Sequence, residues 1–519
     1  MQENSDMRYW LDQLAAKIIE AHPEGEIIIS SGISPSGPYH VGHAREILTA
    51  DAVRRVLIEK GRQARHLHFV DNFDTLRKRY PYLDESYEDH VGKPLYMIPA
   101  PDGSSDNYGE QYFRDYQKSA EMLGVEMEIF KANELYGSGK YSEMINLCLK
   151  QRDKIADILF KISGRELDES WRPIQILDES SGKLNTAKFL DYDFDDNTAD
   201  YIGADGNRYR AYADKGQIKL DWRLDWTARW KLYGVMVEGF GREHATKGGS
   251  YDTGEVLAKE IFDIDPPIPV PYDIIRLVGE TKKMSSSLGN LVTLLESLEI
   301  IPPEILRYFT FKSRPERQLN FDPGAGLYVL MDEYAKTEAA TLNGEQPEFQ
   351  RAWQIANLSG TDHVISTVPF SHMVTVYQTA NGNRDTILEL LERTGHKQAV
   401  KTQKNSIINE LGYVDRWLEL YAPEKVKFVV MKEMPKIEID DASENFLTML
   451  VIELEKTDMQ PGAIHNAVYE SAIKADLKPA DAFKLIYRLF IDKDYGPKIG
   501  FFLSCLPAEF VLQRLSRKK

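Results

Sequence analysis

Residues 26–43 read EIIISSGISPSGPYHVGH, and this stretch indicates the fold of the first half of the chain. Its first five residues form a short apolar run, typical of a buried strand in a parallel sheet. Residues 32–38 hold two glycines and two prolines, so they predict a turn rather than a helix. Helical spacing follows over residues 41–60, and a second strand is predicted over residues 66–70. Strand, turn, helix and strand make a βαβ unit, which predicts a doubly wound parallel sheet.

The turn after the first strand carries two histidines, His40 and His43, at the start of the predicted helix. Glycines in the turn let the backbone approach a ligand closely, and the helix N-terminus offers unpaired amides and a positive dipole end. Two imidazoles on one face of this turn can donate hydrogen bonds to phosphate oxygens as charge builds in a transition state. The alternative is that both histidines only cap the helix. The flanking glycines and prolines favour the phosphate site.

The remainder of the chain changes character twice. Residues 165–215 are acidic and rich in Gly and Asp, which predicts a small β-rich insertion. Residues 266–271 are rich in proline and predict a loop. Nearly every segment from 291 to 515 has helical spacing. We therefore expect an α/β N-terminal half, with a Rossmann-type parallel sheet and an inserted connective module, followed by an all-α helical C-terminal half.

Charge and cysteine content restrict the classes of function. The 519 residues include 64 Lys and Arg against 81 Asp and Glu, a net charge of −17, so the protein is not a general nucleic-acid coater. Any polyanion must bind through local basic patches. Two cysteines, Cys148 and Cys505, make no disulfide framework, which favours a reducing, cytoplasmic location. The first ten residues have no signal-peptide core and no apolar run nears 18 residues, so no membrane partner is expected.

A second motif lies about 240 residues downstream of the first, where residues 282–290 read KKMSSSLGN. A basic, hydroxyl-rich loop ahead of a helical region suits the triphosphate end of ATP. Together the two motifs resemble the His-x-Gly-His and Lys-Met-Ser-Lys-Ser signatures of class I aminoacyl-tRNA synthetases. In that class the two signatures lie at opposite ends of one Rossmann fold, and the spacing leaves room for a connective insertion.

Within that class the chain resembles class I lysyl-tRNA synthetase, in stretches at residues 30–37, 71–77, 222–226, 241–244 and 247–252. The resemblance has specific motifs over roughly residues 5–330 and is one of general pattern beyond them. It implies ATP-dependent formation of lysyl-adenylate from L-lysine, then transfer to the 3′ end of tRNA(Lys), with Mg²⁺ accompanying the nucleotide. Close relatives in the class need tRNA bound before activation, so the same requirement is an open expectation here. The usual second lysine of the downstream motif is Ser286 in this chain.

The resemblance also implies roles for individual residues. The catalytic residues would be His40, His43 and Lys283. The ATP-binding residues would be Ser31, Pro35, Gly37, His40, Gly42, His43, Lys283, Met284, Ser285 and Ser286. The lysine-binding residues would be Gly32, Ser34, Trp222, Asp225, His244 and Tyr272, with Asp225 as the candidate counter-ion of the substrate ammonium. No residue is assigned to a metal.

Five segments are expected along the chain. They are residues 1–130, the first half of the Rossmann catalytic domain; 131–215, a connective insertion with a degenerate zinc-ribbon-like module; 216–290, the second half of the catalytic domain with a mobile Lys-Met-Ser loop; 291–345, a helical region contacting the tRNA stem; and 346–519, a helical anticodon-binding domain. Candidate contacts to tRNA phosphates are Lys401, Lys404, Arg416 and the tail from Arg514 to Lys519.

No zinc is expected in the insertion. Some members of the family carry paired Cys-x-x-Cys motifs there, whereas between His90 and His244 this chain has one cysteine, Cys148, and no histidine. Four ligands drawn mostly from Cys and His are needed for a structural zinc site. Residues 178–182 and 203–206 stand where thiols are expected, and each retains a turn-forming glycine. This pattern predicts a ribbon that has lost its metal.

Three other functions remain open. A glutamyl-tRNA synthetase-like enzyme has a similar plan, but it would need a basic pocket for the substrate carboxylate. A non-catalytic paralogue could bind tRNA or lysine without activating it, although the intact histidines and Lys283 count against this. A nucleotidyltransferase that does not use tRNA is the third, and the long helical C-terminal half disfavours it.

Overall fold

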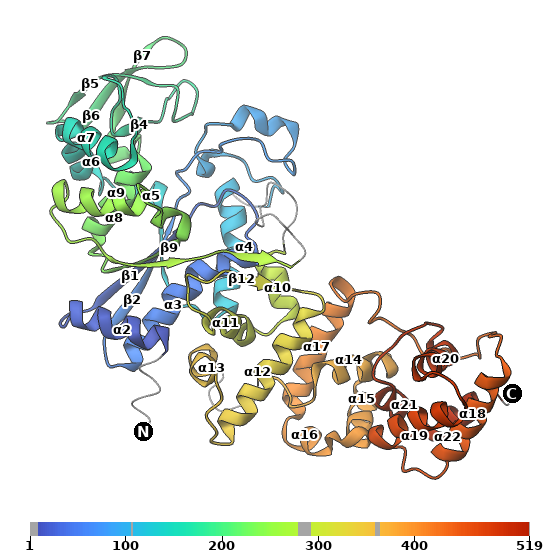
Figure 1. The fold of residues 1–519 in the computed structure, drawn as a ribbon. Helices are drawn as coiled ribbons and strands as arrows, with labels where there is room; N and C mark the ends of the chain where they lie inside the picture. The colour runs from blue at the N-terminus through green and yellow to red at the C-terminus, as the bar shows by residue number, and fades with distance from the viewer. Residues whose placement is uncertain (1–8, 105–106, 279–291, 359–363, 518–519) are drawn as a thin grey trace. The chain divides into compact units, whose positions relative to one another are not determined.

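The computed structural model describes residues 9–104, 107–278, 292–358 and 364–517. The chain divides into two compact units, each built from segments distant in sequence (Figure 1). Unit 1 comprises Met1–Leu298, Leu306–Phe321 and Arg351–Leu358. Unit 2 comprises Glu299–Ile305, Asp322–Gln350 and Ser359–Lys519.

A five-stranded parallel sheet forms the centre of unit 1. Its spatial order is β10 (Ile268–Tyr272), β9 (Val237–Gly241), β1 (Ile27–Ile33), β2 (Ala64–Val70) and β3 (Glu128–Lys131). This is the order of a Rossmann half, which confirms the predicted sheet. The winding reverses between β1 and β9, and ligands of such sheets bind beyond the carboxyl ends of the strands at this switch point.

Three strands differ from the sequence prediction. β2 does so only in beginning two residues earlier, at Ala64. β1 continues to Ile33, three residues past the predicted end, because all seven of its residues pair with β2. The segment predicted as a proline-rich loop contains β10, and Pro269 and Pro271 lie inside it. Proline has no N–H to donate, and it is tolerated here because β10 is the edge strand of the sheet.

Helices pack on both faces of the sheet. α3 (Ala44–Glu59) contacts β1, β2, β9 and β10, and α2 (Trp10–Ala21) packs on α3. α4 (Tyr108–Met122) brings Tyr116 within 5.5 Å of the His68 ring on β2. α8 (Trp222–Tyr233) lies against the opposite face, where Trp226 bonds to Glu238 of β9. The opposite faces follow from alternation along the strands, since Ser30 and Ser31 of β1 point to different sides.

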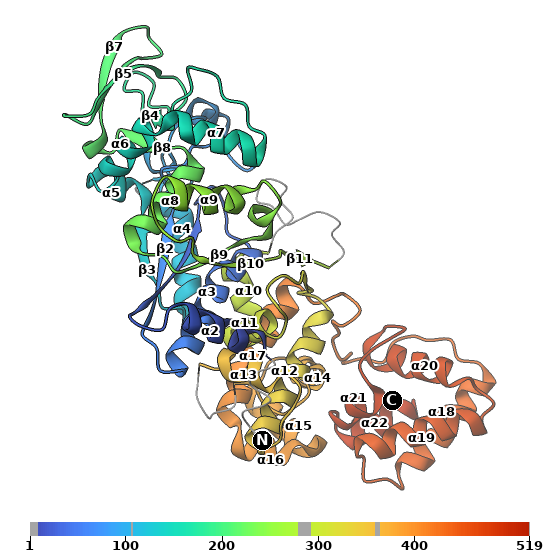
Figure 2. The same ribbon diagram turned by 60° about the vertical axis from the view of Figure 1, so that its left-hand side comes forward.

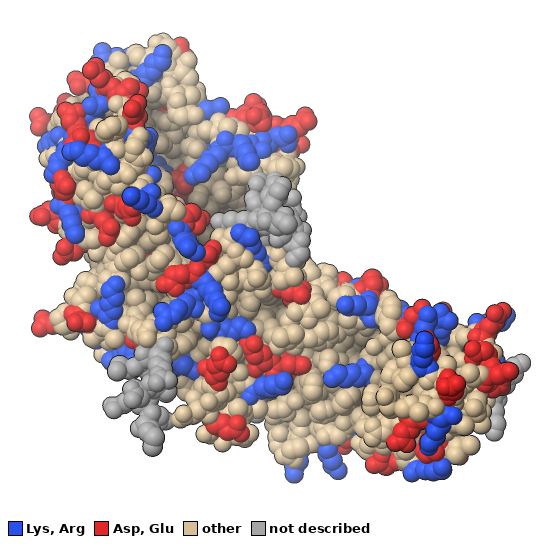
Figure 3. All heavy atoms as spheres, in the orientation of Figure 1, with Lys and Arg blue, Asp and Glu red and all other residues tan. Residues whose placement is uncertain are grey.

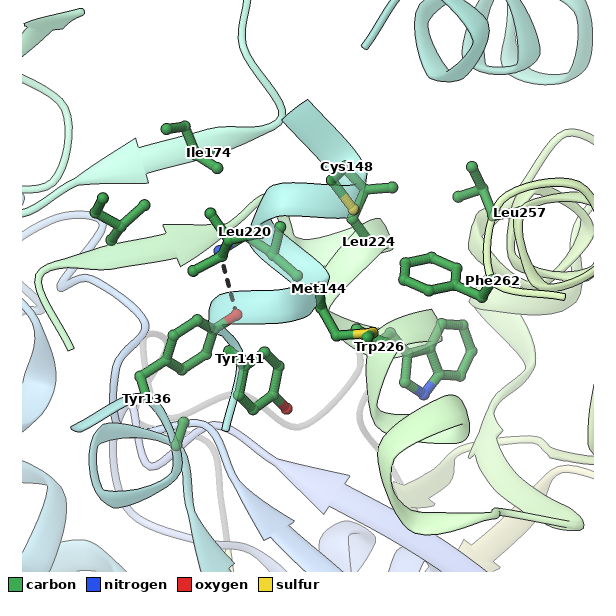
Figure 4. Close-up of a cluster of buried hydrophobic side chains, with 14 of the residues drawn as sticks. Tyr136, Tyr141, Met144, Cys148, Ile174, Leu220, Leu224, Trp226, Leu257 and Phe262 are labelled. Atoms are coloured by element: carbon green, nitrogen blue, oxygen red, sulfur yellow. Dashed lines mark hydrogen bonds between the residues drawn. The ribbon is translucent and has the colours of Figure 1, made fainter. Parts of the chain in front are cut away.

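The insertion between β3 and α8 combines helices with two small antiparallel sheets. Its helices are α5 (Ala132–Gly137), α6 (Ser142–Lys150) and α7 (Arg152–Ser163). β4 (Ile174–Ile176) pairs with β8 (Ile218–Leu220), and β5 (Lys188–Asp193), β6 (Thr198–Ile202) and β7 (Arg208–Tyr212) form the second sheet. α6, β8, α8 and α9 (Ser250–Glu260) share one buried cluster, in which Cys148 and Met144 lie near Leu224 and Trp226 (Figure 4).

The rest of unit 1 follows the sheet in sequence. β11 (Ile275–Leu277) pairs with β12 (Leu319–Phe321), and the helices are α11 (Pro303–Phe311) and α13 (Gln350–Ala356), with α10 (Leu294–Ile300) at the unit boundary. Arg307 of α11 is fully buried and donates to Asp51 of α3 at 2.8 Å and to the carbonyls of Leu123 and Ala356. One guanidinium therefore joins three helices and the end of α4.

Unit 2 consists of helices and their connections in the part that the structure describes (Figure 2). This confirms the predicted helical C-terminal half. No helix among the described residues has the length and apolar character needed to cross a bilayer. The helices are α12 (Gly326–Leu342), α14 (Phe370–Thr379), α15 (Arg384–Leu391), α16 (Lys397–Thr402), α17 (Lys404–Leu420), α18 (Asp441–Leu454), α19 (Pro461–Lys474), α20 (Pro479–Ile491), α21 (Ile499–Ser504) and α22 (Ala508–Leu515).

Candidate active site

A cavity of about 420 Å³ lies at the carboxyl ends of β1 and β9, at the switch point of the sheet. Residues 30–34 of β1 and its following turn line it, together with residues 238–241 of β9. Of the residues that the sequence resemblance assigned to the site, nine line the cavity: Ser31, Gly32, Ser34, His40, Gly42, His43, Trp222, His244 and Tyr272.

Three assigned residues that the structure describes do not appear in the cavity wall, and four others are not described. Pro35 and Gly37 are buried in the turn outside it. Asp225 is also buried away from the wall. Lys283, Met284, Ser285 and Ser286 lie outside the described residues.

The two histidines form a compact turn, η1 (Val41–His43), that leads directly into α3. The His40 N–H donates to Nδ1 of His43 at 3.0 Å, and the Gly42 N–H donates to Nδ1 of His40 at 3.1 Å. The two rings stack with centroids 3.8 Å apart. A neutral imidazole that accepts at Nδ1 carries its proton on Nε2, so each ring retains an N–H donor. The histidines thus cap the helix and line the cavity at the same time.

Gly42 is required by this packing. A Cβ atom at position 42 would lie 2.7 Å from two ring atoms of His40, closer than any real contact. The glycine therefore permits the His40 ring to fold back over the backbone. A larger residue would displace the ring from the cavity wall.

The structure brings the flanks of the second motif to the histidine turn. The Val41 N–H donates to the Val292 carbonyl at 3.0 Å, and the Leu294 N–H donates to the Tyr39 carbonyl at 2.9 Å. On the other flank, Ile275 of β11 lines the cavity. The described residues on either side of segment 279–291 therefore meet the first motif, although they are far from it in sequence.

An aromatic wall forms one side of the cavity. Trp222, Trp226 and Trp230 occupy successive turns of α8, with neighbouring ring centroids 5.1 and 5.2 Å apart. His244, in the turn after β9, lies 5.5 Å from Trp222. Sequence reasoning found Trp222 and His244 but missed the other two indoles. Their i, i+4, i+8 spacing was the available signal.

Asp225 differs from its expected role as counter-ion of the substrate. Its carboxylate accepts from Arg229 at 2.6 Å, one turn along α8, and from the Tyr136 hydroxyl at 3.0 Å. Arg229 also donates to Asp71. Asp225 is therefore committed to an ion pair behind the wall and is not free to act as the counter-ion of the substrate. The i, i+4 spacing on the helix places Arg229 beside it.

The charges that do line the cavity are mostly acidic. Its carboxylic side chains are Glu46, Asp71, Asp74, Glu238 and Glu243, and its basic ones are Arg77 and Arg229. Asp74 is neutralised by Lys219 at 2.5 Å, and Asp71 by Arg229. Burial raises the pKa of Glu46 well above its usual range, although its carboxylate accepts from the Gly32 N–H at 2.9 Å. This arrangement suits a cationic ligand.

Behind the cavity, Ser31 joins two buried histidines of β2. Its hydroxyl lies 2.7 Å from Nε2 of His66 and 2.7 Å from Nδ1 of His68. Burial lowers the pKa of both imidazoles, to about 3 for His66, so both are neutral at physiological pH. The hydroxyl of Ser31 is thus engaged within the sheet.

A parallel sheet of this order, with a histidine turn at its switch point, defines the catalytic domain of a class I aminoacyl-tRNA synthetase. The family described as tRNA synthetases class I (K) matches residues 8–362. Lysine–tRNA ligase of Archaeoglobus fulgidus is 39% identical over 98% of this chain and 99% of its own, and that of Methanosarcina barkeri is 37% identical over 98% and 97%. The chain belongs to the class I tRNA synthetases (K).

Solved structures of other synthetases are more distant. Glutamate–tRNA synthetase from Elizabethkingia anophelis is 11% identical, with a TM-score of 0.42, over 95% of this chain and 99% of that chain. At this distance the likeness carries no argument about the substrate.

The two turns predicted to have lost a zinc ion are joined by a carboxylate. Asp178 is fully buried and accepts from the Ser180 N–H at 3.0 Å, the Thr186 hydroxyl at 2.6 Å and the Ala204 N–H at 2.9 Å. The hydroxyls of Ser180 and Ser181 donate to it as well. No group of three or more His, Cys, Asp or Glu side chains that could hold a metal ion occurs among the described residues. The absence of zinc stays a prediction, which metal analysis of the purified protein tests.

Replacing Asp178 with alanine is expected to destabilise the insertion by about 2–4 kcal/mol, because several buried donors lose their acceptor. Hydrogen–deuterium exchange of residues 178–206 measures the loss. Asp205→Ala is the control, since Asp205 is exposed and, among the described residues, accepts from its near neighbours Asn207 and Tyr209. Equal protection of residues 178–206 from exchange in both variants would contradict the conclusion that Asp178 joins the two turns.

The Asp178 carboxylate also makes the stability of the insertion depend on pH. Burial alone would raise the pKa of Asp178, but hydrogen bonds from Thr186, Ala204 and Ser181 outweigh it and hold the pKa at about 2. A folded pKa below the unfolded value of about 3.9 means that the stabilisation is complete above about pH 4 and is lost as the pH falls towards 2.

Proposed function

We propose that the protein is a class I lysine–tRNA ligase of the cytoplasm, which activates L-lysine with ATP and transfers it to the 3′ end of tRNA(Lys). The observation that carries this proposal is the joining of an acidic, indole-lined cavity to the histidine turn at the switch point of the sheet. Aromatic faces and carboxylates attract an ammonium group, and imidazole donors at a helix N-terminus suit phosphate. The relatives named lysine–tRNA ligase, aligned over nearly the whole chain, support the same reading.

The chemistry needs no covalent nucleophile from the protein. The carboxylate of lysine attacks the α-phosphorus of ATP in line and pyrophosphate leaves. His40 and His43 donate Nε2–H groups to phosphate oxygens as negative charge develops there, while Gly42 keeps both rings in place. Lys283, with Ser285 and Ser286, supplies a cation and hydroxyls for the departing pyrophosphate. Mg²⁺ accompanies the nucleotide and neutralises part of its charge.

The local charges disfavour glutamate as the substrate. A glutamate carboxylate would need a free cation in the pocket. Arg229 is already bound to Asp71 and Asp225. Arg77, the other basic residue of the wall, is outnumbered by the cavity carboxylates, and its charge helps to lower the pKa of Asp74. A non-catalytic paralogue would have no need of two donors preorganised by hydrogen bonds, as those of the histidine turn are.

Aminoacylation of tRNA with each of the twenty amino acids tests the proposal. Lysine alone is expected to be charged, and omission of tRNA from a pyrophosphate-exchange assay determines whether activation requires it. Charging of glutamate would favour the alternative enzyme. Binding of lysine and tRNA without any charging would favour the non-catalytic paralogue.

We further propose that residues 291–345 contact the tRNA stem and that residues 346–519 bind the anticodon end. Two of the expected phosphate contacts are engaged elsewhere. Arg514 is buried and donates to four carbonyls, those of Met431, Lys432, Glu433 and Leu489. Arg416 forms ion pairs with Glu299 and Glu419. The remaining candidates are Lys401, Lys404 and the tail from Arg517 to Lys519.

Affinity for tRNA is expected to fall as a power of the salt concentration, with a shallower slope in the Lys401→Ala/Lys404→Ala variant. Both lysines are exposed and form no ion pair within the part of the chain that the structure describes. Each phosphate contact removed lowers the slope of log affinity against log salt by about one. Basic and acidic side chains are interspersed on the face drawn in Figure 3, and the net charge is −17, so we expect a few local contacts to provide the binding.

Lys484→Ala is the control for this measurement, because Lys484 is paired with Asp494 at 3.0 Å. Its slope is expected to match that of the wild type. A slope unaltered by loss of both Lys401 and Lys404 would remove them from the interface. Truncation after Leu515 applies the same criterion to the tail.

A further inference from the structure

Glu238 is a buried carboxylate at the base of the aromatic wall. It lies on β9 directly beside Ser30 of β1, lines the cavity and is 4% exposed. Its Oε1 accepts from the Trp226 indole N–H at 3.0 Å, and its Oε2 accepts from the Trp230 indole N–H at 3.0 Å and from the Ser30 hydroxyl. A carboxylate has about four acceptor positions, so these three bonds leave one, on Oε1.

Trp222 and Trp226 line the cavity together with this carboxylate, and Trp230 packs against Trp226 outside the cavity wall. The exposed fraction falls from 40% at Trp222 to 5% at Trp226 and 1% at Trp230. Gly32 follows Ser30 on the same face of β1 and has no side chain, so the space above the Ser30–Glu238 pair is not filled from that strand. An unbranched aliphatic chain can lie on the indole faces, which also attract a cation at its end.

Of the other four carboxylates of the cavity, two are committed to ion pairs and two are differently placed; one of the latter, Glu243, is exposed in the turn η5 (Arg242–Ala245) after β9. Asp71 is bound to Arg229 and Asp74 to Lys219. Glu46 comes from α3 and accepts from the Gly32 N–H, at the level of the strand end rather than beneath the indoles. Glu238 forms no ion pair with any Lys, Arg or His in the described segments. A buried carboxylate without a cationic partner is costly, and it marks a site where a ligand supplies the charge.

We infer that Glu238 binds the ε-ammonium of the substrate and thereby determines specificity for a cationic amino acid; the inference rests on the proposed function. The Trp226 and Trp230 N–H groups, with the Ser30 hydroxyl, hold the carboxylate so that its remaining acceptor position on Oε1 is left for the ammonium. The same contact discriminates against an uncharged side chain of equal length, because that side chain would leave the buried carboxylate without a partner.

Lysine binding should then release a proton. Burial raises the pKa of Glu238 to about 7, against the opposing effects of its hydrogen bonds and of Arg229. Glu46 on α3 and Tyr251 on α9 also interact electrostatically with Glu238, whose negative charge raises the pKa of each. The carboxyl is therefore partly protonated before lysine arrives, and the ammonium favours its ionised form. At pH 7 about half a proton per lysine is expected to pass to the buffer.

Calorimetric titration of the wild-type protein with lysine, in two buffers of different ionisation enthalpy, measures this release. The expected result is a release at pH 7 that shrinks towards pH 9, where the carboxyl is already ionised. A heat of binding that is independent of the buffer at pH 7 would overturn the inference. This arm needs no substitution, so it holds even if a variant fails to fold.

Glu238→Gln supplies the second arm, because it removes the charge and keeps the size. In tRNA aminoacylation we expect kcat/KM for lysine to fall by 100-fold or more, mainly through KM, with KM for ATP unchanged. The preference for lysine over norleucine should fall by a similar factor. Glu410→Gln is the matched control: Glu410 is an equally buried carboxylate in unit 2, accepting from Ser366, and its loss should leave the preference intact.

The outcomes separate the inference from the proposed function. A wild-type protein that charges lysine, with a Glu238→Gln variant that retains the lysine preference, would overturn only the role of Glu238. Loss of the preference in Glu46→Gln instead would assign the ammonium to the strand end and likewise overturn it. A wild-type protein that charges no lysine would overturn the proposed function itself.

Discussion

Replacing His43 with alanine is expected to lower the rate of lysyl-adenylate formation by two or more orders of magnitude. The ring stacks on His40, accepts the His40 N–H at Nδ1 and so retains its proton on Nε2. Loss of one preorganised donor to a developing oxyanion typically costs about 3–4 kcal/mol of transition-state stabilisation. Pyrophosphate exchange with lysine, ATP and tRNA measures the rate, and fold stability should change little.

Two further substitutions at position 43 distinguish a role as hydrogen-bond donor to the phosphate from a role as helix cap. Asparagine can still accept the His40 N–H but has no group at the position of Nε2, so its rate should be as low as that of alanine. Glutamine can place an N–H near the position of Nε2, and it should recover part of the rate. A near-normal exchange rate in the alanine and asparagine variants would mean that His43 only caps the helix.

Replacing Arg307 with alanine is expected to destabilise unit 1 by about 3–5 kcal/mol. Its guanidinium is fully buried and holds Asp51, the Leu123 carbonyl and the carbonyls of Ile355 and Ala356. Removing Arg307 leaves the buried carbonyls without this donor and leaves the buried Asp51 carboxylate with the half-buried Arg55 in place of two cations. Breaking a buried pair in this way costs more than the net worth of the pair. Urea unfolding followed by tryptophan fluorescence gives the change in free energy.

Arg416→Ala is the control for this experiment, since its ion pairs with Glu299 and Glu419 lie at the surface and should matter little. Arg307→Leu combined with Asp51→Leu should recover part of the stability, because no buried charge is then left unpaired. An Arg307→Ala variant as stable as the wild type would show that the helices are held by apolar packing alone. Hydrogen–deuterium exchange of α3 and α11 locates the effect.

Local sequence pattern predicted the parts of the fold that depend on neighbours in the chain. The βαβ unit over residues 26–70 could be predicted because apolar runs, glycines and helical spacing act within a few residues. The same holds for the helical half. The end of β1 could not be predicted, because pairing with β2 keeps Ser31 and Gly32 in the strand. The strand β10 could not be predicted either, because Pro269 and Pro271 are tolerated only through its position at the edge of the sheet.

Some residues of the candidate site could likewise be predicted from the sequence, and others could not. Residue types and spacing pointed to His40 and His43, and the family resemblance pointed to Trp222 and His244; all four line one cavity. Asp225 was expected to be the counter-ion of the substrate ammonium, yet burial and the Arg229 guanidinium decide what its carboxylate can bind. No local pattern marked Glu238, because its importance comes from three donors on β1 and α8.

The sequence by itself determined the α/β and all-α halves, the histidine turn and the family, since these follow from residue types at fixed spacing. Only the tertiary structure decided which carboxylate faces the indoles, which arginines are free for phosphate, and how residues 292–294 come to bond with residues 39–41. The physical reason is that ionisation and hydrogen bonding depend on burial and on the nearest opposite charge. Both are contributed by segments far apart in the chain.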